Sequence, residues 1–161
     1  MRSELVIKQA VEEDVPLILF FIKKIAEYEK LSHEVIVTEE ILKESLFGNK
    51  PSAEVVFGYL ENKPVAYAIY FYNFSTFIGK KGLYLEDLFV LPELRGEGIG
   101  KKILLHLVQK ASEENCGRME WAVLDWNESA INFYKSLGAK AMDEWTTFRM
   151  DETAIRKLVL L

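Results

Sequence analysis

Two adjacent acids and three spaced glycines are the residues of this chain whose types and spacing could do chemistry. Glu86 and Asp87 interrupt an apolar run of strand length, and carboxylates in a buried strand cost free energy unless they have a partner or a purpose. Further on, glycines at alternate positions precede a helical pattern: Gly96, Gly98 and Gly100. Such a loop presents unpaired backbone N–H groups at the positive end of a helix dipole, which suits a phosphate or pyrophosphate.

Spacing excludes two common phosphate-binding loops. A Walker A loop needs a glycine five residues before its Gly-Lys pair and a Ser or Thr after it, whereas Gly100-Lys101 has Arg95 five residues back and Lys102 behind it. The dinucleotide fingerprint G-x-G-x-x-G would require a glycine where Lys101 stands. What remains is an R-G-x-G-I-G loop after an E-D-x-x-V strand.

Length and composition indicate an ordinary globular protein. A chain of 161 residues most often forms one domain, which would bury roughly 70% of its unfolded surface. Twenty-five acids against 20 bases give a net charge of −5, which argues against a nucleic-acid partner and is compatible with cationic substrates. Cys116 is the one cysteine, and His33 and His106 stand in no metal-binding spacing, so we expect no disulfide and no metal. Without an apolar signal core or a run of membrane-spanning length, we expect a cytoplasmic protein that does not bind membranes.

Periodicity and end signals predict the elements that must position these residues. We expect strands at residues 5–8, 53–60, 64–74, 83–91, 118–124 and 141–150, with a turn at 61–63 and a loop at 75–82. We expect helices at about 14–30, 38–46, 99–115, 127–137 and 154–160, with N-caps at Asp14, Thr38 and Asn127. This order predicts a mixed α/β sheet with helices on both faces, in one domain spanning residues 1–161.

Two segments resemble those of the GNAT superfamily of N-acetyltransferases. The R-G-E-G-I-G loop is similar to the acetyl-CoA pyrophosphate loop of that family, and V-L-D-W-N-E-S-A-I-N-F-Y-K-S-L-G-A at 123–139 resembles its second conserved segment. The order of elements is also that of the GNAT fold, so the resemblance covers essentially the whole chain. Three shorter stretches, E-Y-E-K-L-S at 27–32, Y-L-E-D-L-F-V at 84–90 and L-D-W-N at 124–127, resemble the diamine and thialysine N-acetyltransferases, the branch that includes spermidine/spermine N1-acetyltransferase.

The resemblance implies acetyl-CoA as a co-substrate. Its pantetheine arm would bind the backbone N–H groups around Leu88, Phe89 and Val90. Its pyrophosphate would bind the loop made by Arg95, Gly96, Glu97, Gly98, Ile99, Gly100 and Lys101. Asn127 and Lys135 would also contact the cofactor. The alternative is a glycine-rich turn that only joins strand to helix.

Acetyl transfer to an amine requires that the amine lose a proton and that the departing thiolate gain one. The resemblance implies that Tyr134 is the general acid for the sulfur. A phenol with a pKa near ~10 can serve a thiol with a pKa near ~8.5. The resemblance also implies that Glu86 takes the amine proton, through water. The alternatives are a tyrosine packed on the core and a hydrogen-bonded strand acid.

The resemblance further implies that Tyr28, Glu29 and Glu86 contact the amine; a solvated helix end is the alternative for the first two. Trp126 could line the amine site, with core packing as its alternative. In a regular strand Asp87 points away from Glu86, so it joins the site only if a bulge re-aims one of them. Ser75-Thr76-Phe77 stands where the polyamine enzyme carries Asp-Pro-Trp. The loss of that carboxylate favours a thialysine-like substrate over spermidine.

We therefore expect a cytoplasmic, acetyl-CoA-dependent N-acetyltransferase that acts directly on a small primary amine: a polyamine, a diamine or a thialysine-like amino acid. We expect it to form a homodimer, with the aromatic stretch 67–74 and the strand at 141–150 supplying the surface. Two other functions stay open. One is acetylation of a protein N-terminus or lysine, and the other is an acyl-CoA-binding module that has lost turnover.

Overall fold

The computed structural model describes residues 4–160, and within them five strands form one sheet in the order β1-β2-β3-β4-β5. The strands are β1 (Val6–Gln9), β2 (Glu54–Leu60), β3 (Lys63–Ser75), β4 (Lys80–Val90) and β5 (Arg118–Trp121). The first four are antiparallel neighbours, and β5 runs parallel to β4. The sheet is therefore mixed, as predicted.

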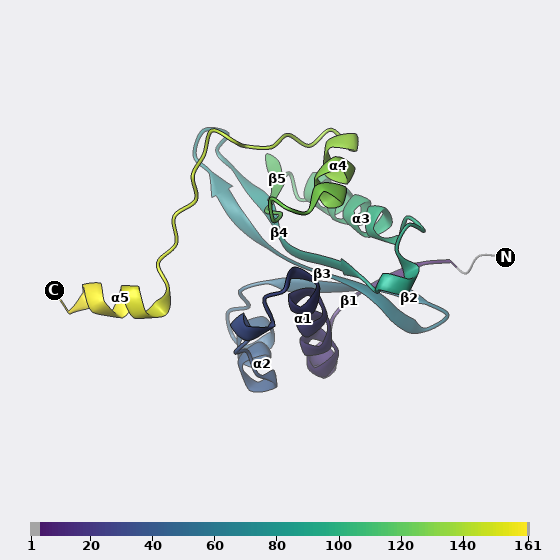
Figure 1. Ribbon diagram of the computed structural model, residues 1–161, viewed down its shortest axis with the longest axis horizontal. Coiled ribbons are helices and arrows are strands. Elements are labelled where there is room, and N and C mark those ends of the chain that lie inside the picture. The colour runs from purple at the N-terminus through teal and green to yellow at the C-terminus, as the bar shows by residue number, and fades with distance from the viewer. Residues whose placement is uncertain (1–3, 161) are drawn as a thin grey trace. The chain divides into compact units, whose positions relative to one another are not determined.

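Helices cover both faces of this sheet (Figure 1). Helices α1 (Val15–Glu29) and α2 (Glu39–Phe47) pack on one face, and α3 (Ile99–Glu113) packs on the other. Helices α4 (Glu128–Ser136) and α5 (Glu152–Val159) follow, and single 3₁₀ turns η1 (Glu12–Asp14), η2 (Ser32–Glu34) and η3 (Pro92–Leu94) lie between the longer elements. The chain divides into two compact units after Ala122, so α4 and α5 belong to the second.

An aromatic core joins α1 to the sheet. Phe21 of α1 is fully buried and stacks on Tyr67 of β3, with ring centroids 5.2 Å apart, and its ring also meets Phe57 and Phe89. On the opposite face the side chain of Ile103 lies 3.2 Å from the point where a Cβ on Gly58 would stand. Apolar burial on both faces holds the sheet between its helices.

The predicted helix ends are confirmed with one difference. Thr38 caps α2, because its Oγ1 accepts a hydrogen bond from the Ile41 N–H at 3.3 Å. Pro16 lies in the first turn of α1, and Lys30 ends that helix in the left-handed conformation, with φ 61°. The carboxylate of Asp14 does not cap α1; it accepts from the Val11 N–H at 2.9 Å instead. The turn predicted at 61–63 joins β2 to β3.

Three predictions about the elements are wrong: two concern boundaries and one concerns a whole strand. The loop expected at 75–82 is shorter, since residues 80–82 open β4 and pair with β3. The strand expected at 118–124 ends at Trp121. Residues 141–150 form no strand at all, and they pair with no other strand between residues 4 and 160.

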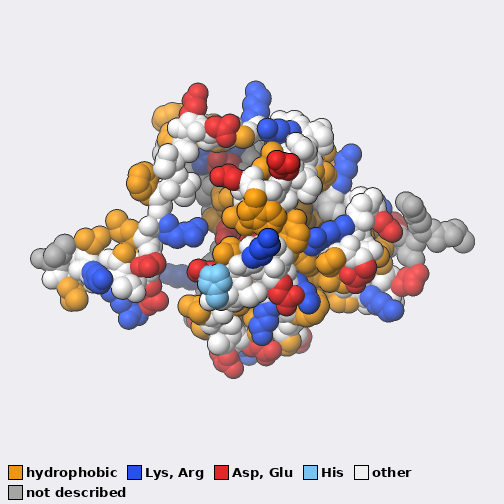
Figure 2. Space-filling view, viewed as in Figure 1, with side chains coloured by type: hydrophobic (Ala, Val, Ile, Leu, Met, Phe, Trp, Pro, Cys, Tyr) orange, Lys and Arg blue, Asp and Glu red, His pale blue; other side chains and the backbone are white. Residues whose placement is uncertain are grey.

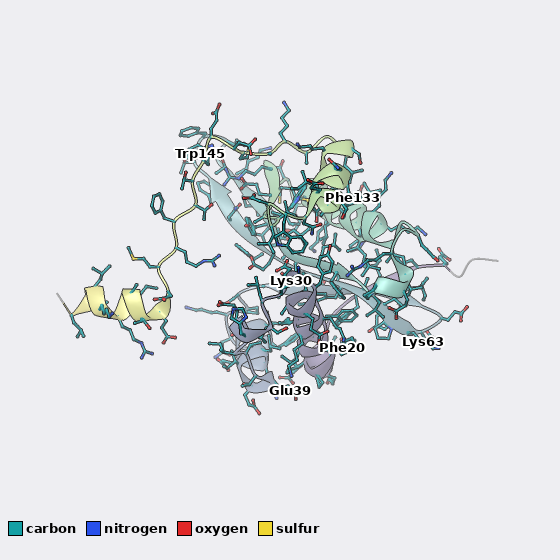
Figure 3. All side chains as sticks on the ribbon, viewed as in Figure 1. Phe20, Lys30, Glu39, Lys63, Phe133 and Trp145 are labelled. Carbon is teal, nitrogen blue, oxygen red and sulfur yellow. The ribbon has the colours of Figure 1, made fainter. Side chains whose placement is uncertain are left out.

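The failed strand prediction has a physical reason. A β-strand persists only where its backbone groups and one of its faces find partners, and sequence alternation cannot provide them. Trp145, labelled in Figure 3, is 74% exposed, and Phe148 is 92% exposed. The dimer surface predicted on this segment is therefore not a strand. The aromatic part of β3 is also not free surface throughout, because Tyr67 and Tyr70 are fully buried.

The part of the chain that the structure describes contains no helix with both the length and the apolar character that a membrane crossing requires.

Candidate active site

A β-bulge in β4 decides where its two adjacent acids point. Ile69 of β3 lies opposite Asp87, while the next residue, Tyr70, lies opposite Leu85, so Glu86 is the extra residue between them. Ile69 and Tyr70 point to opposite faces of the sheet. Leu85 and Asp87 therefore do so as well, although regular alternation would put them on one face. The condition under which both acids share a site is met.

Asp87 lies on the face that α1 covers. Its Oδ2 accepts a hydrogen bond of 2.5 Å from the hydroxyl of Tyr67, whose ring stacks on Phe21. Burial raises the pKa of the Asp87 carboxyl, and the hydrogen bond from Tyr67 opposes that rise. Burial, together with the charge and hydrogen bond of Asp87, holds the pKa of Tyr67 well above its usual value. Tyr67 is therefore a permanent proton donor to this carboxylate.

Glu29, the last residue of α1, completes an acidic cluster. Burial raises the pKa of Glu29, and the negative charges of Asp87 and Glu86 raise it further. The C-terminal end of a helix is itself partly negative, which adds to the same effect. Among residues 4–160, neither Glu29 nor Asp87 takes part in an ion pair. Three carboxylates that repel one another favour the binding of a cation. Figure 3 labels Lys30, which directly follows Glu29 at the end of α1.

Arg95 connects this helix end to the end of β4. Its guanidinium lies 4.4 Å from the ring centroid of Tyr28 and 5.0 Å from that of Phe89, and its Nε donates to the Val90 carbonyl at 3.0 Å. The first residue of the glycine loop and the predicted amine-binding pair at 28–29 are therefore neighbours. Arg95 was predicted only in the cofactor loop, and its contact with Tyr28 is a finding of the structure.

The glycine loop is open on its outer side. Gly96 and Gly98 both have φ 80°, in the left-handed region that favours glycine, and a Cβ at either position would meet no atom within 4 Å. Gly98 is the N-cap of α3, and no side chain caps that helix. The loop thus leaves helix N–H groups and space for an anion, which fits a pyrophosphate.

The backbone of the loop gives a stability prediction with a matched control. Gly98→Ala should lower the free energy of unfolding by about 1–2 kcal/mol, because alanine is strained at positive φ. Gly100→Ala, inside the first turn of α3, meets only Val90 at an ordinary 3.6 Å and should be neutral or up to about 1 kcal/mol stabilising. Urea unfolding of both variants measures the difference, and equal stabilities would contradict the observed backbone.

One edge of β4 fits an extended ligand arm. In the described part of the sheet β5 pairs with β4 only from Gly82 to Leu85, so Leu88, Phe89 and Val90 have no strand neighbour on that side. An extended chain can hydrogen-bond to such an edge as an added strand would. The edge leads directly to the glycine loop, as an arm that ends in a pyrophosphate requires.

The remaining predicted residues belong to the second unit. Asn127 caps α4, since its Oδ1 accepts from the Ala130 N–H at 3.4 Å, which confirms the predicted cap. Tyr134 and Lys135 lie near the end of that helix, and Trp126 precedes it, 51% exposed. Burial raises the pKa of Tyr134, so its phenol keeps its proton at neutral pH. The ring of Phe133, labelled in Figure 3, lies 5.3 Å from that of Tyr134.

Sequence analysis missed Tyr67 as a residue of this site. It predicted only that Tyr67 lies in an aromatic strand. A signal was available, because a buried tyrosine needs a hydrogen-bond partner for its hydroxyl, and the strand predicted after it carries two acids. Across residues 4–160 no three His, Cys, Asp or Glu side chains gather so as to hold a metal ion.

Comparison with known proteins identifies the family of this chain. The sequence model of the acetyltransferase (GNAT) family matches residues 22–139. Thialysine N-epsilon-acetyltransferase of Mus musculus is 39% identical over 94% of this chain and 95% of its own length, and that of Caenorhabditis elegans is 32% identical over 87% and 88%. The solved structure of an integron cassette protein from the mobile metagenome of V. cholerae has a TM-score of 0.80 at 27% identity, and covers 96% of this chain and 97% of that one. The chain therefore belongs to the GNAT family of acetyltransferases.

Proposed function

We propose that this acetyltransferase transfers the acetyl group of acetyl-CoA directly to a small primary amine, and that a thialysine-like amino acid or a diamine is its substrate. The observation that carries the proposal is the acidic cluster of Glu29, Glu86 and Asp87 beside the open end of β4 and the glycine loop. The names of the relatives support it. Two are thialysine N-epsilon-acetyltransferases, and L-ornithine N5-acetyltransferase of Arabidopsis thaliana is 28% identical over 94% of this chain.

In this proposal the first unit binds the two substrates. The backbone at 88–90 would hold the pantetheine arm and the loop at 95–101 would hold the pyrophosphate, with exposed Lys101 adding positive charge. Acetyl-CoA supplies an activated thioester when bound. Glu29 and Asp87 attract the cationic amine, and Tyr28 lies beside them under Arg95.

Three protons move in this reaction. The substrate ammonium loses one before it attacks the thioester carbonyl and a second, to solvent, as the C–N bond forms, and the departing sulfur gains one as the C–S bond breaks. A primary ammonium has a pKa near ~10.4, so it carries its proton at neutral pH and cannot attack. Glu86, exposed on the bulge, takes that proton through water, and Tyr134 gives its proton to the departing sulfur. Asn127 and Lys135 would contact the cofactor and Trp126 the amine. The roles of Asn127 and Lys135 rest on the family resemblance, and that of Trp126 rests on its place beside Asn127 at the start of α4.

The test is release of free thiol from acetyl-CoA with a panel of amines: thialysine, lysine, ornithine, putrescine, spermidine and a short peptide. We expect saturable turnover with a short amino acid or diamine, and weaker turnover with spermidine, since no acid stands at 75–77. Turnover with the peptide alone would assign the enzyme to protein acetylation. Tight CoA binding without turnover of any amine would favour a non-catalytic module.

We also propose that the two units form one acetyltransferase domain and that the chain forms a homodimer. The matched family segment runs across the boundary at Ala122, which supports one domain. Exposed apolar side chains of the C-terminal segment support association: Met142, Trp145, Phe148, Met150, Ile155, Leu158, Val159 and Leu160; Figure 2 shows such side chains on α5. Light scattering on the full chain should give twice the chain mass.

We propose a cytoplasmic enzyme without nucleic-acid or membrane partners, in keeping with its net charge of −5.

A further inference from the structure

We propose that Tyr67 is a positioning residue of this site. Its hydroxyl fixes the Asp87 carboxylate as the group that binds the substrate ammonium, which leaves the neighbouring Glu86 to take the amine proton. The inference deepens the proposed function and rests on it for the identity of the ligand as an amine.

The ring of Tyr67 cannot move its hydroxyl elsewhere. It is fully buried, lies parallel to the ring of Phe21 within 16°, and stands opposite Phe89 in the sheet register. The hydroxyl ends 2.5 Å from Oδ2 of Asp87. Because Tyr67 engages only that oxygen, Oδ1 remains for an N–H group of a ligand. A rigid donor thus sets the direction in which Asp87 presents its second oxygen.

Two acids lie near Asp87, and the hydroxyl of Tyr67 favours its ionised form by a hydrogen bond. The charge of Asp87 acts on Glu29 of α1, and Glu86 is its neighbour in β4. Arg95 holds its guanidinium over the rings of Tyr28 and Phe89. Burial raises the pKa of the Asp87 carboxyl, whereas the hydrogen bond donated by Tyr67 lowers it and so favours the carboxylate. Without the Tyr67 hydroxyl, Asp87 would hold its proton to higher pH and bind an ammonium less well.

The chain offers a matched control. Tyr70 lies in the same strand and is also fully buried, but it points to the opposite face, where its hydroxyl donates to Gln9 Oε1 at 3.4 Å. Tyr67→Phe and Tyr70→Phe each remove one buried hydroxyl and keep the ring. Only Tyr67→Phe removes a hydroxyl that is hydrogen-bonded to the acidic cluster.

We expect Tyr67→Phe to raise the KM for the amine about tenfold or more, since a hydrogen bond to a charged group contributes about 1.5–3 kcal/mol. The acidic limb of kcat/KM should move to higher pH, because loss of the donor raises the pKa of Asp87. The KM for acetyl-CoA should change less than twofold. Tyr70→Phe should leave the amine KM and the pH profile unchanged. Equal effects of the two substitutions would overturn the proposal.

A double-mutant cycle separates positioning from packing. On an Asp87→Asn background, Tyr67→Phe should change the amine KM less than twofold, because the group that it positions is already altered. The same loss on both backgrounds would show that Tyr67 acts through the core.

A second readout does not depend on turnover. Carbon-13 NMR titration of the Asp87 carboxyl should show a higher midpoint in Tyr67→Phe than in the wild-type protein or in Tyr70→Phe. If the wild-type enzyme acetylated no amine of the panel, the proposed function would fail, and this titration would still decide whether Tyr67 controls Asp87. An unchanged midpoint would overturn that control.

Discussion

Tyr134→Phe should lower kcat by about 10²–10⁴-fold, the usual contribution of a general acid, while acetyl-CoA binds almost as tightly as before. The substitution keeps the aromatic ring of residue 134 in α4 and removes only its hydroxyl. Burial raises the pKa of Tyr134, so its phenol still carries its proton when the thiolate leaves. Steady-state thiol release and calorimetric CoA binding measure the two quantities.

A change of leaving group checks the assigned role. With an acetyl thioester whose thiol is more acidic than CoA, the departing sulfur needs less help from an acid. The gap between the wild-type enzyme and Tyr134→Phe should then shrink. Unchanged turnover of acetyl-CoA by the variant would contradict the assignment of Tyr134 as the acid. So would a rate difference between wild type and variant that is the same for both thioesters.

Glu86→Gln should lower kcat/KM for the amine at pH 7 by about 10²–10⁴-fold, because glutamine cannot accept a proton. At that pH only on the order of 1 in 10³ molecules of a primary amine is neutral, given its pKa near ~10.4. The neutral fraction grows tenfold per pH unit, so the rate of the variant should rise with pH. The deficit should nearly vanish towards about pH 10, and a pH series of kcat/KM records this recovery.

Asp87→Asn is the comparison for this experiment. The two carboxylates are adjacent in sequence and both act on Glu29, but it is Asp87 that accepts the hydrogen bond from the Tyr67 hydroxyl. We expect Asp87→Asn to raise the amine KM without the steep recovery at high pH. Identical pH profiles for the two variants would contradict the division of roles between base and binding group.

Short-range patterns in the sequence predict most of the local features of this protein, although the Asp14 side chain does not cap α1. Thr38 and Asn127 cap their helices as predicted, because a cap depends on residues three positions apart. The turn between β2 and β3 formed as predicted for the same reason. The glycine loop also opens α3 as expected, because positive φ at Gly96 and Gly98 is a property of the residue type. These are short-range effects, and short-range patterns report them.

Pairing across the sheet decided the rest. The segment 141–150 has strand-like composition but finds no partner strand in the described residues, so it forms no strand. The bulge at Glu86 is a shift in register between β3 and β4, which no pattern within β4 alone reveals. That shift turns Asp87 to the face that α1 covers, where the hydroxyl of Tyr67 in β3 reaches it. The packing of α1 brings Glu29 close to both acids. The sequence identifies the acids, but register and helix packing determine that they act at one site, since both join residues distant in the chain.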